Sequence, residues 1–293
     1  MSARQTLRRL PDGRRLHLGD GPIDLIIEAW GAREAVEAAY RAAIARFGTI
    51  LDELCAELPA LRAPAGEGAP QSPVGLRMAQ AVAPFSAAHF ITPMAAVAGA
   101  VADEIADAMT LAAPLKRCAV NNGGDIALRL APGESLALGL VDRPDKPSLF
   151  ARAAINAEDG VGGVATSGWR GRSFSLGVAD AATVLARDAA SADAAATLVA
   201  NAVDLPGHSA IVRVPANALK PDSDLGARLV TRDVGALSDD DIAIALRRGR
   251  EKAREFENSG RIRAAALHLA GRTITIGALE RLAAPERRAH AAG

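Results

Sequence analysis

Aromatic residues are scarce in this chain, at 3% of 293 residues. A hydrophobic core must therefore be built mainly from Ala, Val, Leu and Ile. An excess of either charge is also absent, because 34 Lys and Arg residues balance 34 Asp and Glu residues. A chain without a basic bias offers no electrostatic argument for nucleic acid or for an acidic membrane surface. We therefore expect neither partner.

Signatures of disulfides and of zinc sites are absent as well. The two cysteines, Cys55 and Cys118, form no CxxC pair, and the five histidines show no HExxH spacing. This pattern argues against a disulfide framework, a structural zinc site and a metalloprotease site. The charged N-terminal stretch lacks the apolar segment of a signal peptide, and no run reaches the roughly 18 apolar residues of a membrane helix. The expected location is the cytoplasm.

The remaining composition is typical of a globular protein, with 49% hydrophobic and 23% charged residues. Segments with helical and strand periodicity alternate irregularly, which favours an α+β fold over a doubly wound sheet. Hydrophobic spacing predicts a long helix over residues 33–58, ended by the proline that follows, and short strands over residues 118–184. We expect one domain over residues 1–283 with a mobile loop near residues 63–73, and a disordered tail over residues 284–293.

The first stretch of chemical interest is VNNGGDI, at residues 120–126. Asn-Gly between two β-like runs predicts a tight hairpin, which by itself accounts for the pattern. Two adjacent glycines followed by Asp125 also let a backbone approach a ligand closely. Both interpretations stay open at this point.

A second stretch, VATSGWRGRSF, brings hydroxyls and a flexible backbone together at Thr166, Ser167 and Gly168. Such groups suit phosphate or ribose oxygens, and Arg170 and Arg172 can add charge-assisted hydrogen bonds. An ordinary strand end followed by a Ser-Gly turn explains the same residues. The sequence contains neither a Walker A loop nor a GxSxG element, so a P-loop NTPase and a Ser hydrolase have no specific support.

The helix predicted from ASADAAATLVANAV, at residues 190–203, carries one acid and one hydroxyl in a nearly apolar run. Asp193 and Thr197 are four residues apart and therefore lie on one helix face. Ser191 is placed to cap the start, and an acid in the first turn complements the helix dipole. The same two oxygen-bearing groups are also hard ligands of the kind that Mg²⁺ combines with substrate phosphates.

Another small-residue helix is predicted to begin at Pro93, which suits a first turn. Gly99 within it indicates a close backbone contact, because glycine otherwise costs about 1 kcal/mol relative to Ala in a helix. Its acids, Asp103 and Glu104, are expected to form a solvated end.

These elements together contain four short motifs, AGAVAD, NNGGD, TSG and ADAAAT, at residues 98–103, 121–125, 166–168 and 192–197. Their order resembles that of the ApbE-type FAD:protein FMN transferases, which carry KGxxxD, NxGGD, TSG and ADAxxT. The longer stretches around the motifs are similar to an uncharacterised ApbE-like family. That second resemblance covers most of residues 14–282.

The resemblance implies an α+β, T-fold-related core of antiparallel sheet with packed helices, and an FAD site with Mg²⁺. In the transferases the Asp and Thr of ADAxxT bind the metal, which makes Asp193 and Thr197 the expected metal ligands. The glycine-rich and TSG motifs help to build the nucleotide cleft of the family. The residues expected to bind the cofactor are Asn122, Gly123, Gly124, Asp125, Thr166, Ser167 and Gly168.

Two departures from the transferase pattern leave the activity open. The Lys before the helix Gly is Ala98 here, and the HxIxDPxTG segment after TSG is missing, with Asp180 alone in place of its acid. Loss of a positive charge and an imidazole weakens the case for a reaction that must stabilise a pyrophosphate leaving group. No catalytic residue is assigned for this reason.

Three functions stay open. The first is a Mg-dependent flavin transferase or FAD pyrophosphatase, and the second is a non-catalytic flavin- or nucleotide-binding carrier in cofactor metabolism. The third is an accessory protein with another small acid in the cleft. A transferase also requires a protein partner that accepts the flavin, and this partner is unidentified. Residues 213–226 carry no predicted function, and Asp222 and Asp224 are expected to be turn and cap residues.

Overall fold

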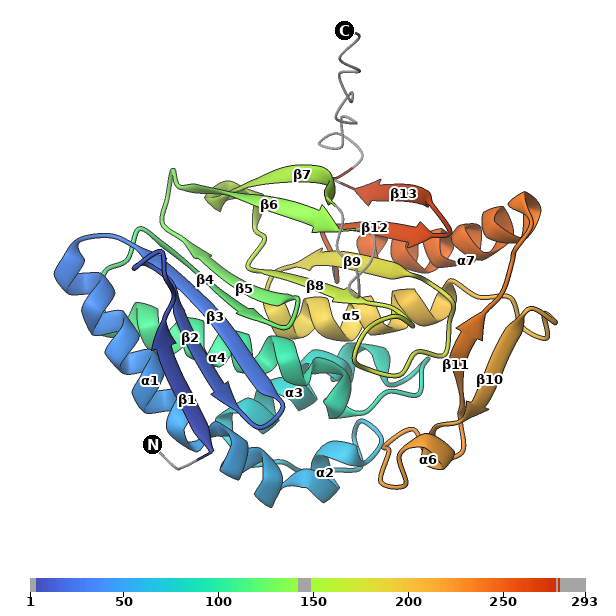
Figure 1. Ribbon diagram of the computed structural model, residues 1–293, viewed down its shortest axis with the longest axis horizontal. Coiled ribbons are helices and arrows are strands. Elements are labelled where there is room, and N and C mark those ends of the chain that lie inside the picture. The colour runs from blue at the N-terminus through green and yellow to red at the C-terminus, as the bar shows by residue number, and fades with distance from the viewer. Residues whose placement is uncertain (1–3, 142–148, 278, 280–293) are drawn as a thin grey trace, which may run out of the picture.

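The computed structural model describes residues 4–141, 149–277 and 279. Its centre is an antiparallel sheet with the strand order β1-β2-β3-β4-β5-β8-β9-β12-β13 (Figure 1). These strands are β1 (Gln5–Arg9), β2 (Leu16–Asp20), β3 (Ile23–Trp30), β4 (Arg117–Asn122), β5 (Asp125–Leu130), β8 (Gly163–Ser167), β9 (Ala181–Ala186), β12 (Ala264–Leu269) and β13 (Arg272–Gly277).

Helices cover one face of the sheet, and a two-stranded ribbon lies against part of the other face (Figure 1). The ribbon pairs β6 (Ser135–Val141) with β7 (Leu149–Asn156). The helices are α1 (Arg33–Ala56), α2 (Leu58–Arg62), α3 (Pro73–Val82), α4 (Val97–Ala112), α5 (Ala189–Ala202), α6 (Ala216–Leu219) and α7 (Asp239–Asn258). An antiparallel sheet with packed helices confirms the expected α+β class.

The sheet separates two hydrophobic clusters, because alternate side chains of each strand point to opposite faces. The larger cluster fills the space between sheet and helices and includes Leu25 of β3 and Phe47 of α1. The smaller cluster lies under the ribbon, where Leu138 and Ile155 join Val164 of β8. Each large side chain buried in this way contributes roughly 1.5–3 kcal/mol to stability.

Alanine fills much of the larger cluster, as the scarcity of aromatic residues leads one to expect. The Ala-rich helix α5 packs closely on α4 and on strands β8 and β9. A Cβ on Gly99 of α4 would lie 2.2 Å from the carbonyl oxygen of Ala189, and a Cβ on Gly163 of β8 would lie 2.1 Å from the Ala189 nitrogen. The close backbone contact expected at Gly99 is therefore confirmed.

Two helix boundaries differ from the prediction. Helix α5 is capped by Asp188, whose side chain accepts the Ser191 N–H at 2.7 Å, so the predicted cap residue Ser191 lies inside the helix. Helix α1 ends at Ala56, and Pro59 belongs to the first turn of α2 instead of ending one long helix. The first turn accommodates proline because an N–H at that position has no intrahelical acceptor.

A second ribbon, formed by β10 (Ile211–Pro215) and β11 (Leu229–Val234), stands beside the main sheet, and α6 follows its first strand (Figure 1). This part of the chain carries no function predicted from the sequence. The loop expected near residues 63–73 connects α2 to α3, and its mobility stays a prediction. The tail at residues 284–293 lies outside the described residues.

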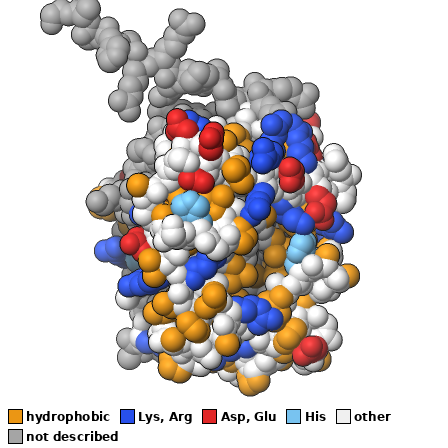
Figure 2. Space-filling view, turned by 90° about the vertical axis from the view of Figure 1, so that its right-hand side faces the viewer, with side chains coloured by type: hydrophobic (Ala, Val, Ile, Leu, Met, Phe, Trp, Pro, Cys, Tyr) orange, Lys and Arg blue, Asp and Glu red, His pale blue; other side chains and the backbone are white. Residues whose placement is uncertain are grey.

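None of the described helices is both long and apolar enough to cross a membrane. On the face that Figure 2 shows, basic and acidic side chains lie intermixed, in keeping with the net charge of zero. This face shows no extended basic stripe of the kind that tracks a nucleic-acid backbone.

Candidate functional site

Two adjoining cavities lie where the β4–β5 turn and the end of β8 meet the first turns of α4 and α5. The first has a volume of about 390 Å³ and the second of about 280 Å³. They share part of their lining, so we describe them as the first and second lobes of one cleft. The shared residues are Ala98, Asp125, Arg172, Ser173, Asp193 and Thr197. Together the lobes have the size typical of small-molecule sites.

Most of the predicted site residues line the first lobe, although they come from three separate segments of the chain. These residues are Gly123, Asp125, Thr166, Ser167, Gly168, Asp193 and Thr197. Asn122 and Gly124, also predicted to bind the cofactor, line neither lobe.

The hairpin expected at Asn122 and Gly123 forms, and its turn consists of Gly123 and Gly124 with φ of 67° and 116°. Glycine adopts such positive φ values without the steric cost that other residues incur. A Cβ on Gly123 would lie 1.9 Å from an Arg172 guanidinium nitrogen, so the glycine leaves space for that guanidinium. Asn122 donates its side-chain amide to the Ala98 carbonyl at 3.1 Å and so ties the hairpin to α4.

The end of β8 forms another wall of the first lobe. The Thr166 N–H donates to the Asp125 carboxylate at 3.2 Å, and the Thr166 hydroxyl hydrogen-bonds Thr183 of β9 at 2.9 Å. A Cβ on Gly168 would lie 2.6 Å from the carbonyl oxygen of Asp180, so glycine is required at this bend. The strand end is thus held against both β5 and β9.

The loop after β8 brings Arg170 and Arg172 to the first lobe. Arg170 pairs with the buried carboxylate of Asp180 at 2.6 Å, and Trp169 donates its indole N–H to the same oxygen at 3.2 Å. The Ala270 N–H donates to the other Asp180 oxygen at 2.7 Å. Through these contacts Asp180 anchors the loop. It lines neither lobe, so it does not place an acid in the cleft.

Asp193 and Thr197 line both lobes, which confirms that they share one face of the helix. The Gly99 N–H donates to Asp193 Oδ2 at 3.0 Å. Asp193 therefore caps the first turn of α4, a neighbouring helix, and not the start of its own helix. Capping and ligand binding were alternative interpretations of this acid, but the structure makes them compatible.

Asp125 and Asp193 form a pair of partly buried carboxylates on the cleft wall. Burial raises the pKa of Asp125 to about 7, although the Thr166 N–H and the Arg172 charge act to lower it. Burial also raises the pKa of Asp193 well above its usual range, and the charge of Asp125 adds to that rise. Because like charges at such a site disfavour each other, a cation bound beside the pair would act against both rises in pKa.

The donor set of the cleft fits a hard divalent cation such as Mg²⁺. Asp125 and Asp193 provide carboxylate oxygens and Thr197 provides a hydroxyl oxygen, which are ligand types that Mg²⁺ prefers. Among the described residues, no group of three or more His, Cys, Asp or Glu side chains is placed to hold a metal alone. Waters and phosphate oxygens of a ligand would therefore complete the coordination.

Apart from the residues that it shares with the first lobe, the second lobe is lined by residues that have no ligand-binding role predicted from the sequence. Arg62 of α2, Met94 before α4, Phe174 and the loop at residues 220–225 contribute to its walls. These segments are far apart along the chain, and the loop between α6 and β11 joins them, because Asp224 accepts the Thr92 hydroxyl and Asp222 pairs with Arg62. In the sequence, the two acids of the 220–225 loop are the feature that could have indicated this wall of the cleft.

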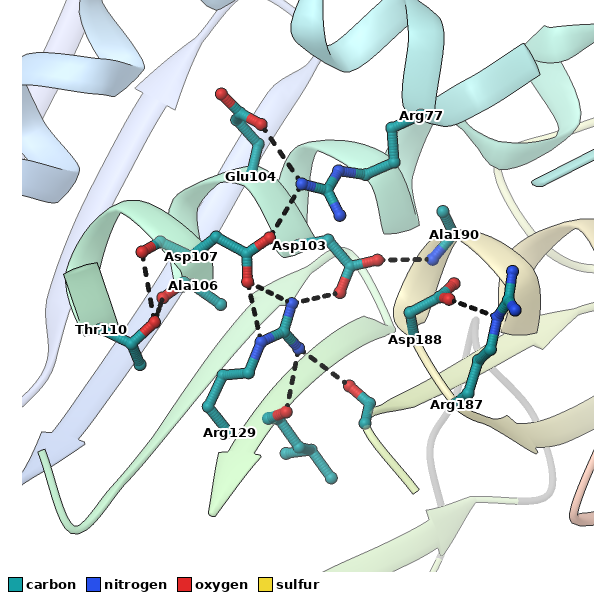
Figure 3. A network of polar contacts seen from close by, with 12 residues as sticks. Arg77, Asp103, Glu104, Ala106, Asp107, Thr110, Arg129, Arg187, Asp188 and Ala190 are labelled. Atoms are coloured by element: carbon teal, nitrogen blue, oxygen red, sulfur yellow. Dashed lines mark hydrogen bonds and ion pairs between the residues drawn. The ribbon is translucent and has the colours of Figure 1, made fainter. Parts of the chain in front are cut away.

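Asp103 and Glu104, expected at a solvated helix end, instead lie in a network of ion pairs around α4 (Figure 3). Asp103 is fully buried, pairs with Arg129 at 3.0 Å and accepts the Ala190 N–H at 2.9 Å. Glu104 pairs with Arg46 of α1 at 2.6 Å. Burial raises the pKa of Asp103, and the Arg129 charge acts against that rise. The expectation was wrong because α5 and β5 cover this face of α4.

Curated proteins that resemble part of this chain include several named UPF0280. The UPF0280 protein of Methanopyrus kandleri is 41% identical over 135 residues, which cover 46% of this chain and 50% of the relative. A UPF0280 protein of Methanothrix thermoacetophila is 41% identical over 132 residues, which cover 45% of this chain and 52% of the relative. The chain thus spans about half the length of the curated relatives it matches.

Two solved structures are similar at low sequence identity. The ApbE protein of Thermotoga maritima has 13% identity and a TM-score of 0.43, over 95% of this chain and 99% of that chain. The flavinyl transferase ApbE of Pseudomonas stutzeri, in its apo form, has 12% identity and a TM-score of 0.42, over 96% of this chain and 98% of that chain.

A sequence model of a whole family matches most of this chain. The match begins within β1, includes the hairpin and the cleft-lining segments, and ends within β13. Because the model of the family described as AbpE bacteria matches residues 7–275, this chain belongs to that family.

Proposed function

We propose that this protein binds a nucleotide pyrophosphate such as FAD, together with Mg²⁺, in the two-lobed cleft. The observation that carries the proposal is the pair of partly buried carboxylates, Asp125 and Asp193, beside Thr197 on one wall. Such a pair is costly without a positive partner. A divalent cation that also binds ligand phosphates is a partner of the required kind.

The walls of the first lobe suit the phosphates of such a ligand. Arg170 and Arg172 contribute positive charge, while Ser167 and Gly168 offer a hydroxyl and an accessible backbone. Hydrogen bonds between Arg and phosphate are stronger than neutral ones because both groups are charged. A bound Mg²⁺ would supply further neutralisation of phosphate charge. Membership of the AbpE family supports the flavin-related character of the ligand.

The residues around the cleft favour binding without turnover, as in a carrier or accessory protein of cofactor metabolism. Ala98, which lines both lobes, stands where the transferases have a Lys, and Asp180 is engaged in anchoring a loop. Among the described residues, no histidine lines either lobe. Cleavage of FAD or transfer of FMN is the second candidate function, favoured by Asp193 and Thr197 because a metal there would neutralise a leaving phosphate.

The test is incubation of the purified protein with FAD, with and without Mg²⁺, while bound flavin and released FMN and AMP are measured together. We expect flavin binding that requires Mg²⁺, and no release of FMN or AMP. FMN and AMP formed only with Mg²⁺ would make pyrophosphate cleavage the function. Equal flavin binding with and without Mg²⁺ would contradict the metal assignment.

The variants for this test must separate the loss of a ligand from the loss of the fold. Asp193 also caps α4, so Asp125→Asn and Thr197→Val are measured beside Asp193→Ala, with circular dichroism as the check on folding. Asp233→Ala is the control, because this exposed acid lies on β11 and lines neither lobe. We expect Mg²⁺-dependent binding to weaken in the three cleft variants only. A cytoplasmic location and a protein partner stay predictions.

A further inference from the structure

The loop at residues 220–225 is a preformed wall of the second lobe. Backbone hydrogen bonds close it on itself, from the Ser223 N–H to the Lys220 carbonyl and from the Gly226 N–H to the Ser223 carbonyl. The Asn217 N–H also donates to the Gly226 carbonyl and so joins the end of the loop to α6. These bonds give the loop a defined shape that does not depend on a ligand.

Two acids hold this loop against the rest of the protein. Asp224 Oδ2 accepts the Thr92 hydroxyl at 2.5 Å, and Thr92 is only 2% exposed. Asp222 pairs with Arg62 at 2.7 Å, but its side chain is 55% exposed. An ion pair this exposed contributes little to stability. The contact between Asp224 and Thr92 is therefore the one that positions the loop next to the start of α4.

The second lobe differs chemically from the first. Met94, Val97, Phe174 and Leu225 are partly buried and give it apolar surface, whereas the described residues that line the first lobe are Ala98, glycines and polar side chains. Apolar side chains combined with placed polar groups are typical of small-molecule sites, and they suit a planar ring. A nucleotide with its phosphates in the first lobe would therefore place a ring system in the second.

Asp224 is the acid of this lobe that is available to such a ring. One of its oxygens accepts the Thr92 hydroxyl, and within the described part of the chain no group donates a hydrogen bond to the other. A carboxylate oxygen accepts hydrogen bonds and does not donate them. The complementary ligand group is thus an N–H on the ring, either a ring imide or an exocyclic amine.

We propose that Asp224 is a specificity-determining residue that accepts a hydrogen bond from an N–H group on the heteroaromatic ring of the bound nucleotide. This assignment rests on the proposed function, since it requires the phosphates to occupy the first lobe. It also gives a role to residues 213–226, which the motifs of the cleft leave unexplained. The loop then distinguishes nucleotides from ligands that offer phosphates alone.

The test compares the binding of FAD, ADP and inorganic pyrophosphate, each with Mg²⁺, to the full chain and to Asp224→Asn. Asparagine keeps an oxygen for Thr92 but presents N–H donors in place of the second acceptor. We expect Asp224→Asn to weaken FAD binding at least about tenfold, the scale of a lost hydrogen bond to a charged group. Pyrophosphate binding should stay within about twofold, and Asp233→Asn, the same change at an exposed site of the ribbon, should alter neither.

The three probes also tell which ring the lobe holds. Loss of both FAD and ADP binding assigns the adenine ring to it, and loss of FAD binding alone assigns the flavin ring. A second measurement uses the unaltered protein and two FAD analogues, one methylated at flavin N3 and one dimethylated at the adenine amine. One of these analogues should bind at least about tenfold more weakly than FAD, because its N–H donor is lost.

The outcomes separate this inference from the proposed function. Equal losses of FAD and pyrophosphate binding in Asp224→Asn, or unchanged binding of all three probes and both analogues, would overturn the role of Asp224 alone. In that case, binding of Mg²⁺ and pyrophosphate by the wild-type protein would still support phosphate binding in the first lobe. A wild-type protein that binds none of the probes overturns both proposals.

Discussion

Asp103 and Asp193 cap each other's helices. Asp103 on α4 accepts the Ala190 N–H at the start of α5, at 2.9 Å, and Asp193 on α5 accepts the Gly99 N–H at the start of α4, at 3.0 Å. Each carboxylate thus satisfies a backbone donor that its partner helix leaves free in the first turn. The exchange locks the two helices together and sets the position of Asp193, which also lines the cleft.

Removal of the Asp103 carboxylate should destabilise the protein strongly. Asp103→Ala leaves Arg129, whose side chain is 25% exposed, without its buried partner and leaves the Ala190 N–H without its acceptor. Because Arg129 keeps its pair with Asp107, the cost comes mainly from the buried Ala190 N–H left without an acceptor, about 1–3 kcal/mol. The free energy of unfolding, measured with urea, reports the change. Asp107→Ala is the control, because Asp107 pairs with the same arginine but is 44% exposed, and a cost as large as that of Asp103→Ala would contradict the interpretation.

Gly99 should be intolerant of even one methyl group. Its Cβ would lie 2.2 Å from the Ala189 carbonyl oxygen, which is backbone and has no freedom to move aside without shifting α5. Overpacking of this kind costs about 1–3 kcal/mol. Gly48→Ala in α1 is the matched control, because no heavy atom lies within 4 Å of its Cβ position. The control should stabilise the protein by up to about 1 kcal/mol through helix propensity, so urea unfolding should show changes of opposite sign.

The stability of the metal-free protein should fall as the pH rises from about 4 to 7. The pKa of Asp125 rises from 3.8 to about 7 on folding, so between these values the folded state binds more protons than the unfolded state. The resulting stabilisation is complete below about pH 4 and is lost as the pH rises through about 7, with a slope of up to about 1.4 kcal/mol per pH unit. Urea unfolding at several pH values in the presence of a chelator measures it.

The comparison with Asp125→Asn separates the contribution of Asp125, including its effect on the pKa of Asp193, from the remaining titrating groups. Burial lowers the pKa of His89, which gives a dependence of opposite sign in the same range, but this contribution is common to both proteins. The difference between wild type and variant should therefore decline with rising pH. Added Mg²⁺ should reduce the fall of wild-type stability with rising pH and should leave the pH profile of Asp125→Asn unchanged. Parallel pH profiles for the two proteins would show that Asp125 has an ordinary pKa.

Features with a local signal were predicted well from the sequence. The hairpin follows from the Asn-Gly signal between β-like runs, although its turn is Gly123-Gly124, one residue later than predicted, and Asn122 ends β4. The contact at Gly99 follows from a glycine in an otherwise good helix. The shared face of Asp193 and Thr197 follows from helix periodicity alone. Each of these inferences needs only neighbours along the chain.

Features that depend on contacts between distant segments were not predicted. Asp103 has the sequence pattern of a solvated acid, yet α5 and β5 bury it. Asp193 caps a helix at Gly99, which lies 94 residues earlier in the sequence. The second lobe was missed for the same reason, because Arg62 and Asp224 line it from segments about 160 residues apart, where Arg62 pairs with Asp222. Helix and strand periodicity does not tell which other element packs against a given face of a helix or strand.

Arg172 should contribute to binding through the phosphates and not through the ring. Its guanidinium lies beside Gly123, and the residue lines both lobes. Arg172→Gln should therefore weaken FAD and pyrophosphate binding by similar factors, about tenfold each, because both ligands lose the same charge-assisted hydrogen bond. Isothermal titration in the presence of Mg²⁺ measures both affinities.

Arg232→Gln is the control for Arg172→Gln, because Arg232 is exposed on β11 and lines neither lobe. It should leave both affinities unchanged. The Arg172 effect should also shrink as salt is raised, since exposed charges are screened over about 10 Å at 0.1 M ionic strength. If Arg172→Gln weakened FAD binding and spared pyrophosphate, the guanidinium would contact the ring, and the phosphates would have to be placed elsewhere in the cleft.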